Sequence, residues 1–266
     1  MKVKANGITI NCRIDGNSVG DWVTLVPGIG NDLTFWDALA PALAQDFRIL
    51  RYDPRGHAGS DTPTGPYSFD DAVGDVAGLW DALAIKRSHV VGLGFGGSTA
   101  FGIAIGHPRR TISLVPCCCR AVMTEEFAAN WRQRLTMVEE TGMEGLGAAT
   151  VERWFTEPFR RENPETIEAV RRMFLRTTEA GFRGFIAAFL GLDYRAGIGG
   201  ISAPTLLIGG GEDRGGGPRE IMAQLATEIP NARHHVIEGA SHICNIERPD
   251  AFNTAVAAFL REHRER

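Results

Sequence analysis

Short, nearly continuous apolar segments alternate with longer helical patterns along most of the chain, and this alternation is the strongest constraint on its fold. Gly, Pro or Asp bounds each apolar segment. The segments are residues 23–28, 47–53, 88–94, 111–116, 204–210 and 234–239. Continuous apolar strands are typical of a parallel sheet buried on both faces. Their alternation with helices predicts an α/β fold with a mostly parallel, doubly wound sheet.

The first 16 residues follow a different pattern, because apolar and polar residues alternate on both sides of Asn6-Gly7. This pair tolerates the positive φ angles of a tight turn. We therefore expect an antiparallel hairpin at the N-terminus.

Three segments have the marks of amphipathic helices. After Ser68, which has capping-box spacing to Asp71, apolar residues recur every three or four positions up to Leu83. Similar patterns predict helices over residues 33–45 and 248–263, the latter with Pro249 in its first turn.

The alternation breaks once, between residues 120 and 196, where the sequence is helical in period and rich in charged and aromatic residues. We expect residues 1–119 and 197–266 to form the core and residues 120–196 to form a helical cap. Because the segment follows a strand directly, it is a candidate lid over the strand ends, where α/β sheets place their binding sites.

Composition limits the partners of the protein. The 266-residue chain has a formal net charge of -4 and no long basic run, which argues against binding to nucleic acid or an acidic membrane surface. It has no signal-peptide pattern and no run of about eighteen apolar residues. We expect a cytoplasmic protein that binds a small molecule. The sequence leaves its oligomeric state open.

The five cysteines form no CxxC pair and no metal-ligand spacing, so no metal site is expected. Their odd number fits a reducing compartment better than a set of disulfides. The adjacent residues Cys117, Cys118 and Cys119 are expected to be small buried residues at a strand end.

The stretch VVGLGFGG, residues 90–97, predicts a sharp turn from a strand into a helix, and three interpretations compete. It approaches the dinucleotide fingerprint GxGxxG, but about 85 residues precede it and no ribose-binding acid follows the next strand. It also fits a nucleophile elbow, where small residues such as Gly92, Gly96 and Gly97 relieve crowding. The third interpretation is a purely structural turn. In the elbow pattern GxSxG, the serine position is Gly94.

Several motifs resemble the 3-oxoadipate enol-lactonase branch of the α/β-hydrolases over most of the chain. They are RYDPRGHAGSDTP, HPRR, NWRQR followed by GMEGL, ERWFTEPFR and GASHICNIERPDAF. The resemblance implies an α/β-hydrolase fold with a helical cap insertion, a lactone or ester substrate, no cofactor, and a triad of serine, acid and histidine.

Two triad positions carry over from this resemblance. His242, in GASHICNIERP, matches the histidine loop, and Asp213, in GGGEDRGGGP, matches the acid. Their order along the chain is the one expected for the fold. Asp213 would hold the His242 imidazole in the tautomer that leaves its other nitrogen free as a base. By position, the backbone amides of Ile29 and Phe95 would form the oxyanion hole, although Pro27-Gly28 departs from the sequence that this turn usually has in the family.

Glycine at position 94 has no atom that can attack a carbonyl, and loss of a triad serine costs a factor of about 10⁶ in rate. Ser98 lies one helical turn further along, several ångströms from the elbow. Two accounts stay open. In one, glycine has replaced a serine in an engineered variant. In the other, glycine is native, and His242 with Asp213 activates a water molecule or serves another acid–base reaction.

The cap supplies candidate substrate-binding residues. Trp131 and Arg134 share a helix face, and an arginine fork suits a substrate carboxylate. The alternative is a solvated arginine beside a packed tryptophan. Trp154 either walls the pocket or fills the cap core, and His57 steadies a turn. Besides a small-molecule hydrolase, a catalytically silent binding protein and a cofactor-free lyase or isomerase with His242 as base remain alternatives.

Overall fold

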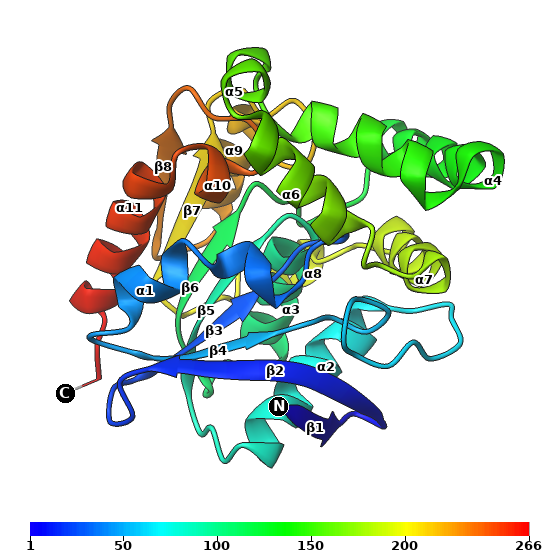
Figure 1. Ribbon diagram of the computed structural model, residues 1–266. Helices are drawn as coiled ribbons and strands as arrows, with labels where there is room; N and C mark the ends of the chain where they lie inside the picture. The colour runs from blue at the N-terminus through cyan, green and yellow to red at the C-terminus, as the bar shows by residue number, and fades with distance from the viewer. Residues whose placement is uncertain (266) are drawn as a thin grey trace.

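Eight strands form a single sheet in the order β1-β2-β4-β3-β5-β6-β7-β8 in the computed structural model, which describes residues 1–265 (Figure 1). β1 and β2 form an antiparallel hairpin, β2 runs antiparallel to β4, and the remaining strands are parallel. The strands are β1 Lys2–Ala5, β2 Ile8–Gly16, β3 Trp22–Val26, β4 Arg48–Tyr52, β5 Ser88–Leu93, β6 Thr111–Cys117, β7 Thr205–Gly210 and β8 Ala232–Ile237.

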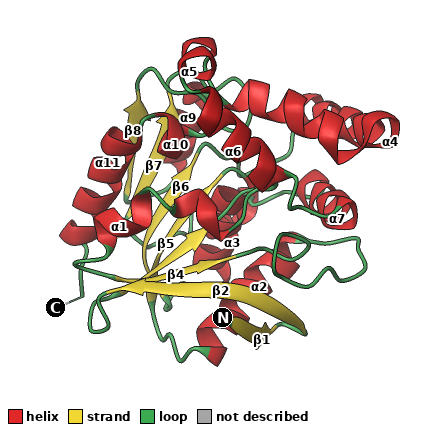
Figure 2. Ribbon diagram, in the orientation of Figure 1, coloured by secondary structure: helices red, strands yellow, loops and turns green. Residues whose placement is uncertain are grey.

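Helices cover both faces of the sheet (Figure 2). One face carries α2 (Phe69–Ala82), α3 (Phe95–Gly106), α8 (Arg195–Ile198) and α9 (Arg219–Glu228). The other face carries α1 (Leu39–Leu43) and α11 (Pro249–Glu262), with the 3-10 turn η1 (Leu33–Trp36) and α10 (Cys244–Glu247) close by. The predicted α/β-hydrolase fold with a doubly wound sheet is therefore confirmed.

The local signals in the sequence account for several of these elements. Asn6 and Gly7 have φ angles of 48° and 78°, as a tight hairpin turn requires. The side chain of Ser68 accepts from the Asp71 amide and the Asp71 carboxylate accepts from the Ser68 amide, which completes the capping box of α2. Pro249 stands in the first turn of α11.

One predicted helix is wrong in its extent. Residues 33–45 form the short turn η1 and the separate helix α1 instead of one continuous helix. Asp32 caps η1 by accepting from the Thr34 amide, and Pro41 has no amide hydrogen with which to continue a helical ladder from the preceding residues.

The segment between β6 and α8 is helical, as expected, and lies beyond the carboxyl ends of the strands (Figure 1). It consists of α4 (Glu125–Trp154), α5 (Glu157–Glu162), α6 (Pro164–Phe174) and α7 (Glu179–Leu190). Gly142 has non-helical angles and divides α4 into two parts. One isolated β-bridge, His57 with Thr177, connects the segment to the core, and a second, Val122 with Asp193, joins the two ends of the segment. The cap boundaries at residues 120 and 196 stay a prediction.

Strand order brings distant loops together at one end of the sheet. β3 has β4 on one side and β5 on the other, so the chain reverses its direction of winding at β3. Such a switch point leaves a crevice outside the carboxyl ends of the two strands. The loop after β3 and the turn after β5 therefore lie side by side.

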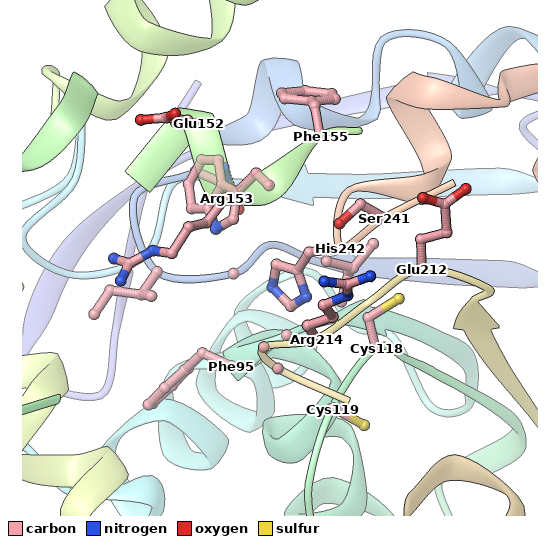
Figure 3. Close-up of a pocket in the computed structure, with 18 of the residues that line it drawn as sticks. Phe95, Cys118, Cys119, Glu152, Arg153, Phe155, Glu212, Arg214, Ser241 and His242 are labelled. Atoms are coloured by element: carbon pink, nitrogen blue, oxygen red, sulfur yellow. The ribbon is translucent and has the colours of Figure 1, made fainter. Parts of the chain in front are cut away.

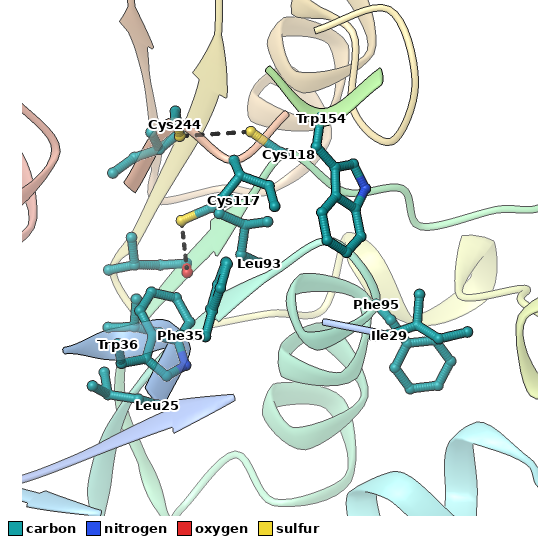
Figure 4. Packing of buried hydrophobic residues seen from close by; sticks show 14 of the residues in the cluster. Leu25, Ile29, Phe35, Trp36, Leu93, Phe95, Cys117, Cys118, Trp154 and Cys244 are labelled. Carbon is teal, nitrogen blue, oxygen red and sulfur yellow. Dashed lines mark hydrogen bonds between the residues drawn. The ribbon is translucent and has the colours of Figure 1, made fainter. Parts of the chain in front are cut away.

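The cysteine triplet lies in the core beneath this crevice. Cys117, Cys118 and Cys119 are buried, as expected, and the thiols of Cys118 and Cys244 lie 3.8 Å apart (Figure 4). All five cysteines are free. Within residues 1–265, no helix combines the length and the apolar character that crossing a membrane requires.

Candidate active site

The turn between β5 and α3 has the strained geometry expected of a nucleophile elbow. Gly94 has φ 60° and ψ -120°, a combination that residues with a side chain rarely adopt. Its amide donates to the carbonyl of Cys117, 2.9 Å away, which ties the turn to the end of β6. A Cβ atom at Gly96 would overlap the carbonyl oxygen of Val26, and one at Gly92 would overlap the carbonyl of Gly96. The glycines therefore let α3 begin directly against β3.

Asp213, which is buried, and His242, which is partly exposed, form a hydrogen-bonded pair. Asp213 follows β7 and His242 follows β8, and the distance from His242 Nδ1 to Asp213 Oδ2 is 3.0 Å. The amides of Gly215 and Gly217 also donate to the carboxylate, at 2.8 and 3.0 Å. Burial alone would raise the pKa of Asp213, but His242 and the two amides outweigh it, and the pKa is lowered. Asp213 is thus held ionised and acts as an acceptor for His242 Nδ1–H.

The other nitrogen of this imidazole faces the elbow. A Cβ atom at Gly94 would lie 3.3 Å from His242 Nε2 and 3.7 Å from Cε1. Apart from the neighbouring residues of the chain, no other atom of residues 1–265 would come within 4 Å of it. The sequence prediction that the elbow, Asp213 and His242 converge therefore agrees with the geometry. We refer below to the space beside Gly94 Cα and His242 Nε2 as the Gly94 notch.

Two backbone amides beside the notch have no acceptor among the described residues. Ile29 lies in the loop after β3 and Phe95 directly follows Gly94, and both line the cavity described below. Neither amide donates to another atom within residues 1–265. The ring of Phe95 packs against Phe69 and Phe185, with centroids 4.4 and 4.6 Å away, and so anchors its backbone. Free amides of this kind can stabilise a developing negative charge.

His57 supports the loop that carries Ile29. Its Nε2 accepts from the amide of Gly30 at 2.9 Å, and its Nδ1 lies 2.9 Å from the carbonyl of Arg55. Burial lowers the pKa of His57 to about 4, so the ring is neutral and Nε2 can accept. His57 thus steadies a turn, as the sequence suggested.

A cavity of about 450 Å³ lies above the notch, with Phe95 and His242 among its lining side chains (Figure 3). This volume suits a small organic molecule. The cap supplies its roof through Trp131, Arg134 and Trp154. Trp154 both walls the cavity, with its ring centroid 6.5 Å from that of His242, and packs against Phe174 of the cap.

Two buried N–H groups of α4 in this roof have no hydrogen-bond partner in the described part of the chain. The guanidinium of Arg134 lies 4.0 Å above the Trp131 ring, and neither Arg134 Nε nor Trp131 Nε1 has a hydrogen-bond partner within residues 1–265. Burial lowers the pKa of Arg134, and the charge of Arg153 lowers it further. Arg134 as a whole is only half-buried, but its Nε–H and the Trp131 N–H are buried without acceptors, which is costly, and a bound anion would satisfy both.

The sequence interpretation missed several residues at this site. Arg153, Arg160 and Arg214 also line the cavity, but charged residues on a cap helix or a loop are normally solvated and gave no signal. Glu247 is buried and accepts from the amides of Thr156 and Ser241, at 3.0 and 2.7 Å. It thereby joins the end of α4 to the residue before His242. Its place five residues after His242 in HICNIERP was the only available hint.

The Ser98 hydroxyl and the Cys118 thiol also lie near the site, and both already contact other groups of the protein. The Ser98 hydroxyl donates to the carbonyl of Arg120 at 2.7 Å and is fully buried, so it does not replace the absent serine oxygen. The donor atoms of Cys118, Asp213 and His242 lie within 4.8 Å of one another. However, the Asp213 oxygens already accept three hydrogen bonds, while the contact with Cys244 and burial raise the pKa of the Cys118 thiol. These features do not favour a metal at this position.

Comparison with known proteins agrees with the fold and extends it. A family model described as "Alpha/beta hydrolase family" matches residues 25–255. The chain is 30% identical to 3-oxoadipate enol-lactonase 2 of Acinetobacter baylyi over 97% of this chain and 95% of that protein. It is 29% identical to a putative carbamate hydrolase RutD of a Caulobacter species, over 93% of this chain and 94% of that protein.

Solved structures give the same result. The enol-lactonase from Burkholderia xenovorans superimposes with a TM-score of 0.94 at 35% identity, covering 98% of this chain and all of that chain. A thermophilic esterase from Thermogutta terrifontis, solved with malate bound, has a TM-score of 0.92 at 28% identity, covering 100% and 99% of the two chains. On the family match, the relatives and the shared fold, this chain is a member of the alpha/beta hydrolase family.

Proposed function

We propose that the protein hydrolyses a small lactone or ester that carries a carboxylate, without a cofactor and without a nucleophilic side chain of its own. The observation that carries this proposal is the position of His242 Nε2, which faces the notch at Gly94 while Nδ1 is held by Asp213. The hydrolase relatives support the class of reaction.

In the proposed reaction, His242 Nε2 takes a proton from a water molecule located in the Gly94 notch. The water oxygen attacks the carbonyl carbon of the substrate, and the amides of Ile29 and Phe95 stabilise the negative charge on the carbonyl oxygen. The intermediate then collapses with loss of the alkoxide or enolate, which takes the proton from His242. Asp213 stabilises the imidazolium that exists between the two steps.

The carboxylate of the substrate is proposed to bind at the roof. Arg134 and Trp131 offer unpartnered donors on the same face of α4, and an arginine forms its strongest hydrogen bonds with carboxylates. One cavity is lined by Trp131 and Arg134 at the roof and by Gly94 and His242 at the notch. The lactone or ester group of a small acid can therefore reach His242 while its carboxylate is bound at the roof.

Two variants test this proposal on a carboxylated enol-lactone and on 4-nitrophenyl acetate. We expect the parent chain to hydrolyse the lactone, and His242→Ala to lose this activity by a factor of about 10²–10⁴, the range for a general base. Gly94→Ser is expected to increase the rate on both substrates if the rest of the site is intact.

Other outcomes would favour the alternatives. Saturable binding without turnover in either the parent or Gly94→Ser would indicate a silent binding protein. Conversion of the lactone to an isomer without uptake of water, lost in His242→Ala, would indicate a non-hydrolytic reaction with His242 as base. Activity that appears only in Gly94→Ser would support the account in which glycine has replaced a serine.

A further inference from the structure

We propose that the substrate carries an aromatic ring between its carboxylate and its ester or lactone group, and that this ring binds against a wall of aromatic side chains in the cavity. This inference rests on the proposed function, because it uses the same cavity and the same carboxylate site. It goes further in naming the class of substrate, an aromatic carboxylate in place of an aliphatic acid.

Four aromatic side chains that line the cavity are in contact with one another, and Phe189 of α7 is at their centre. The centroid of its ring lies 5.6 Å from that of Phe95 and 5.0 Å from that of Trp131. It lies 5.7 Å from that of Phe127. All three contacts are edge-to-face, the arrangement in which aromatic rings attract each other and into which a further ring fits. We call these four residues the aromatic wall.

The aromatic wall extends from the elbow to the roof. At one end, Phe95 directly follows Gly94. At the other end, the guanidinium of Arg134 lies 4.0 Å above the ring of Trp131. A ligand that binds Arg134 through its carboxylate and reaches His242 with its ester group would therefore have its middle part along the wall. The cavity of about 450 Å³ leaves room for a ring at this position.

The charges beside the aromatic wall favour an anionic ligand over a cationic one. Clusters of aromatic side chains can also enclose cations. Here, however, the guanidinium of Arg120 lies 4.1 Å above the Phe127 ring, as that of Arg134 does above Trp131. The Nε of Arg120 also has no hydrogen-bond partner within residues 1–265. Two positive charges at these rings repel a cation and attract a carboxylate.

Benzoate and cyclohexanecarboxylate separate the effect of the aromatic ring from that of apolar area. Both carry one carboxylate on a ring of six carbons, and the saturated ring has more C–H surface to bury. Contacts between aromatic rings contribute beyond the burial of apolar area, and a saturated ring cannot make them. Tighter binding of benzoate would therefore report contacts with the aromatic wall.

Isothermal titration calorimetry with these two ligands tests the inference. We expect the parent chain to bind benzoate about three- to tenfold more tightly than cyclohexanecarboxylate. In Phe189→Leu this difference should disappear, because the central ring of the aromatic wall is lost. The matched control is Phe259→Leu, which should keep the difference, since Phe259 is buried on α11 against His263 and is not part of the cavity lining. Arg134→Met should weaken both ligands, which places them at the roof.

The possible failures are distinguishable. Equal affinities, or tighter binding of cyclohexanecarboxylate, would overturn the inference, while hydrolysis that depends on His242 would leave the proposed function in place. A preference for benzoate in a chain without hydrolytic activity would support the aromatic wall and contradict the proposed reaction. If neither ligand binds, the inference and the proposed carboxylate site are both overturned. Should Phe189→Leu not fold, which circular dichroism checks, Phe127→Leu replaces it, and the comparison in the parent chain is unaffected.

Discussion

The floor and the roof of the cavity differ in how completely their polar groups are hydrogen-bonded within the protein. The floor consists of Gly94, Asp213, His242 and the amides of Ile29 and Phe95. Its charged group, the Asp213 carboxylate, accepts three hydrogen bonds. The roof is formed by Trp131, Arg134 and Trp154 of α4, and here one guanidinium nitrogen and one indole nitrogen have no partner among residues 1–265. A satisfied carboxylate holds its neighbour in place, whereas unsatisfied donors favour a ligand. The floor is therefore suited to chemistry and the roof to choosing the substrate.

The largest expected effect is on the floor. Asp213→Asn should lower kcat by a factor on the order of 10³, because the amide cannot stabilise the imidazolium or fix the His242 tautomer in the same way. KM for a carboxylated substrate should stay within a small factor, since the roof is untouched. Steady-state kinetics measure both constants, and a change confined to KM would contradict the division between floor and roof.

The pH dependence of stability is the next largest effect. The folded-state pKa of His57 is about 4, below its ordinary value of 6.5, so the unfolded chain binds the proton more tightly. The stability that His57 contributes is fully present above pH 6.5 and is lost as the pH falls towards 4. The loss is about 3 kcal/mol for one such histidine.

Urea unfolding of the parent and of His57→Gln at intervals between pH 7.5 and pH 4.5 tests this expectation. The free energy of unfolding should fall less steeply with decreasing pH in the variant. His89, whose pKa burial also lowers to about 4, should keep part of the slope in both proteins. Parallel curves would show that His57 is not the neutral acceptor for the Gly30 amide.

The roof is tested by Arg134→Met, which keeps much of the side-chain volume and removes the charge. Affinity for a carboxylate ligand such as malate should weaken about 10- to 100-fold, the range for a charge-assisted hydrogen bond. Hydrolysis of neutral 4-nitrophenyl acetate should change little. Arg132→Met is the matched control, because Arg132 lies on the same helix but is exposed and paired with Glu125. Equal losses in the two variants would remove Arg134 from the site.

The smallest expected effect concerns the connection between the two regions. Glu247→Gln should lower the free energy of unfolding by about 1–2 kcal/mol. The NH2 group of the new carboxamide would face the backbone amide of Thr156 or Ser241 and could not accept its hydrogen bond. The control is Glu220→Gln on α9, whose side chain is exposed. Urea unfolding at neutral pH compares them, and equal stabilities would show that Glu247 does not join cap and core.

The sequence predicted the floor better than the roof, for physical reasons. Gly94, Asp213 and His242 each follow a parallel strand, and the carboxyl ends of such strands meet at one edge. β5 and β7 are buried as expected, whereas β8 is the edge strand and is only partly buried, because no further strand covers it. The hairpin at Asn6-Gly7 and the capping box at Ser68 were predictable because their signals are local.

The rest depends on contacts between distant segments. Glu247 contacts Thr156, 91 residues earlier in the chain, and no periodic pattern reveals such a pair. The division of residues 33–45 into η1 and α1 was missed because the apolar pattern resembles one helix, although Pro41 breaks its hydrogen bonding. Whether Arg134 is solvated or enclosed depends on how α4 folds over the sheet, which helix period alone does not fix.

The central claim is that the acyl group passes from the substrate to a small molecule at Gly94 without becoming attached to the chain. Intact-mass spectrometry of samples quenched during turnover of 4-nitrophenyl acetate tests it most directly, with Gly94→Ser as the positive control. The account predicts turnover by the parent with no acetylated protein and no initial burst of nitrophenol, and an acetylated intermediate with a burst in Gly94→Ser. An acetyl group on the parent at Ser98, Cys118 or any other side chain, formed and lost at the rate of turnover, would contradict it.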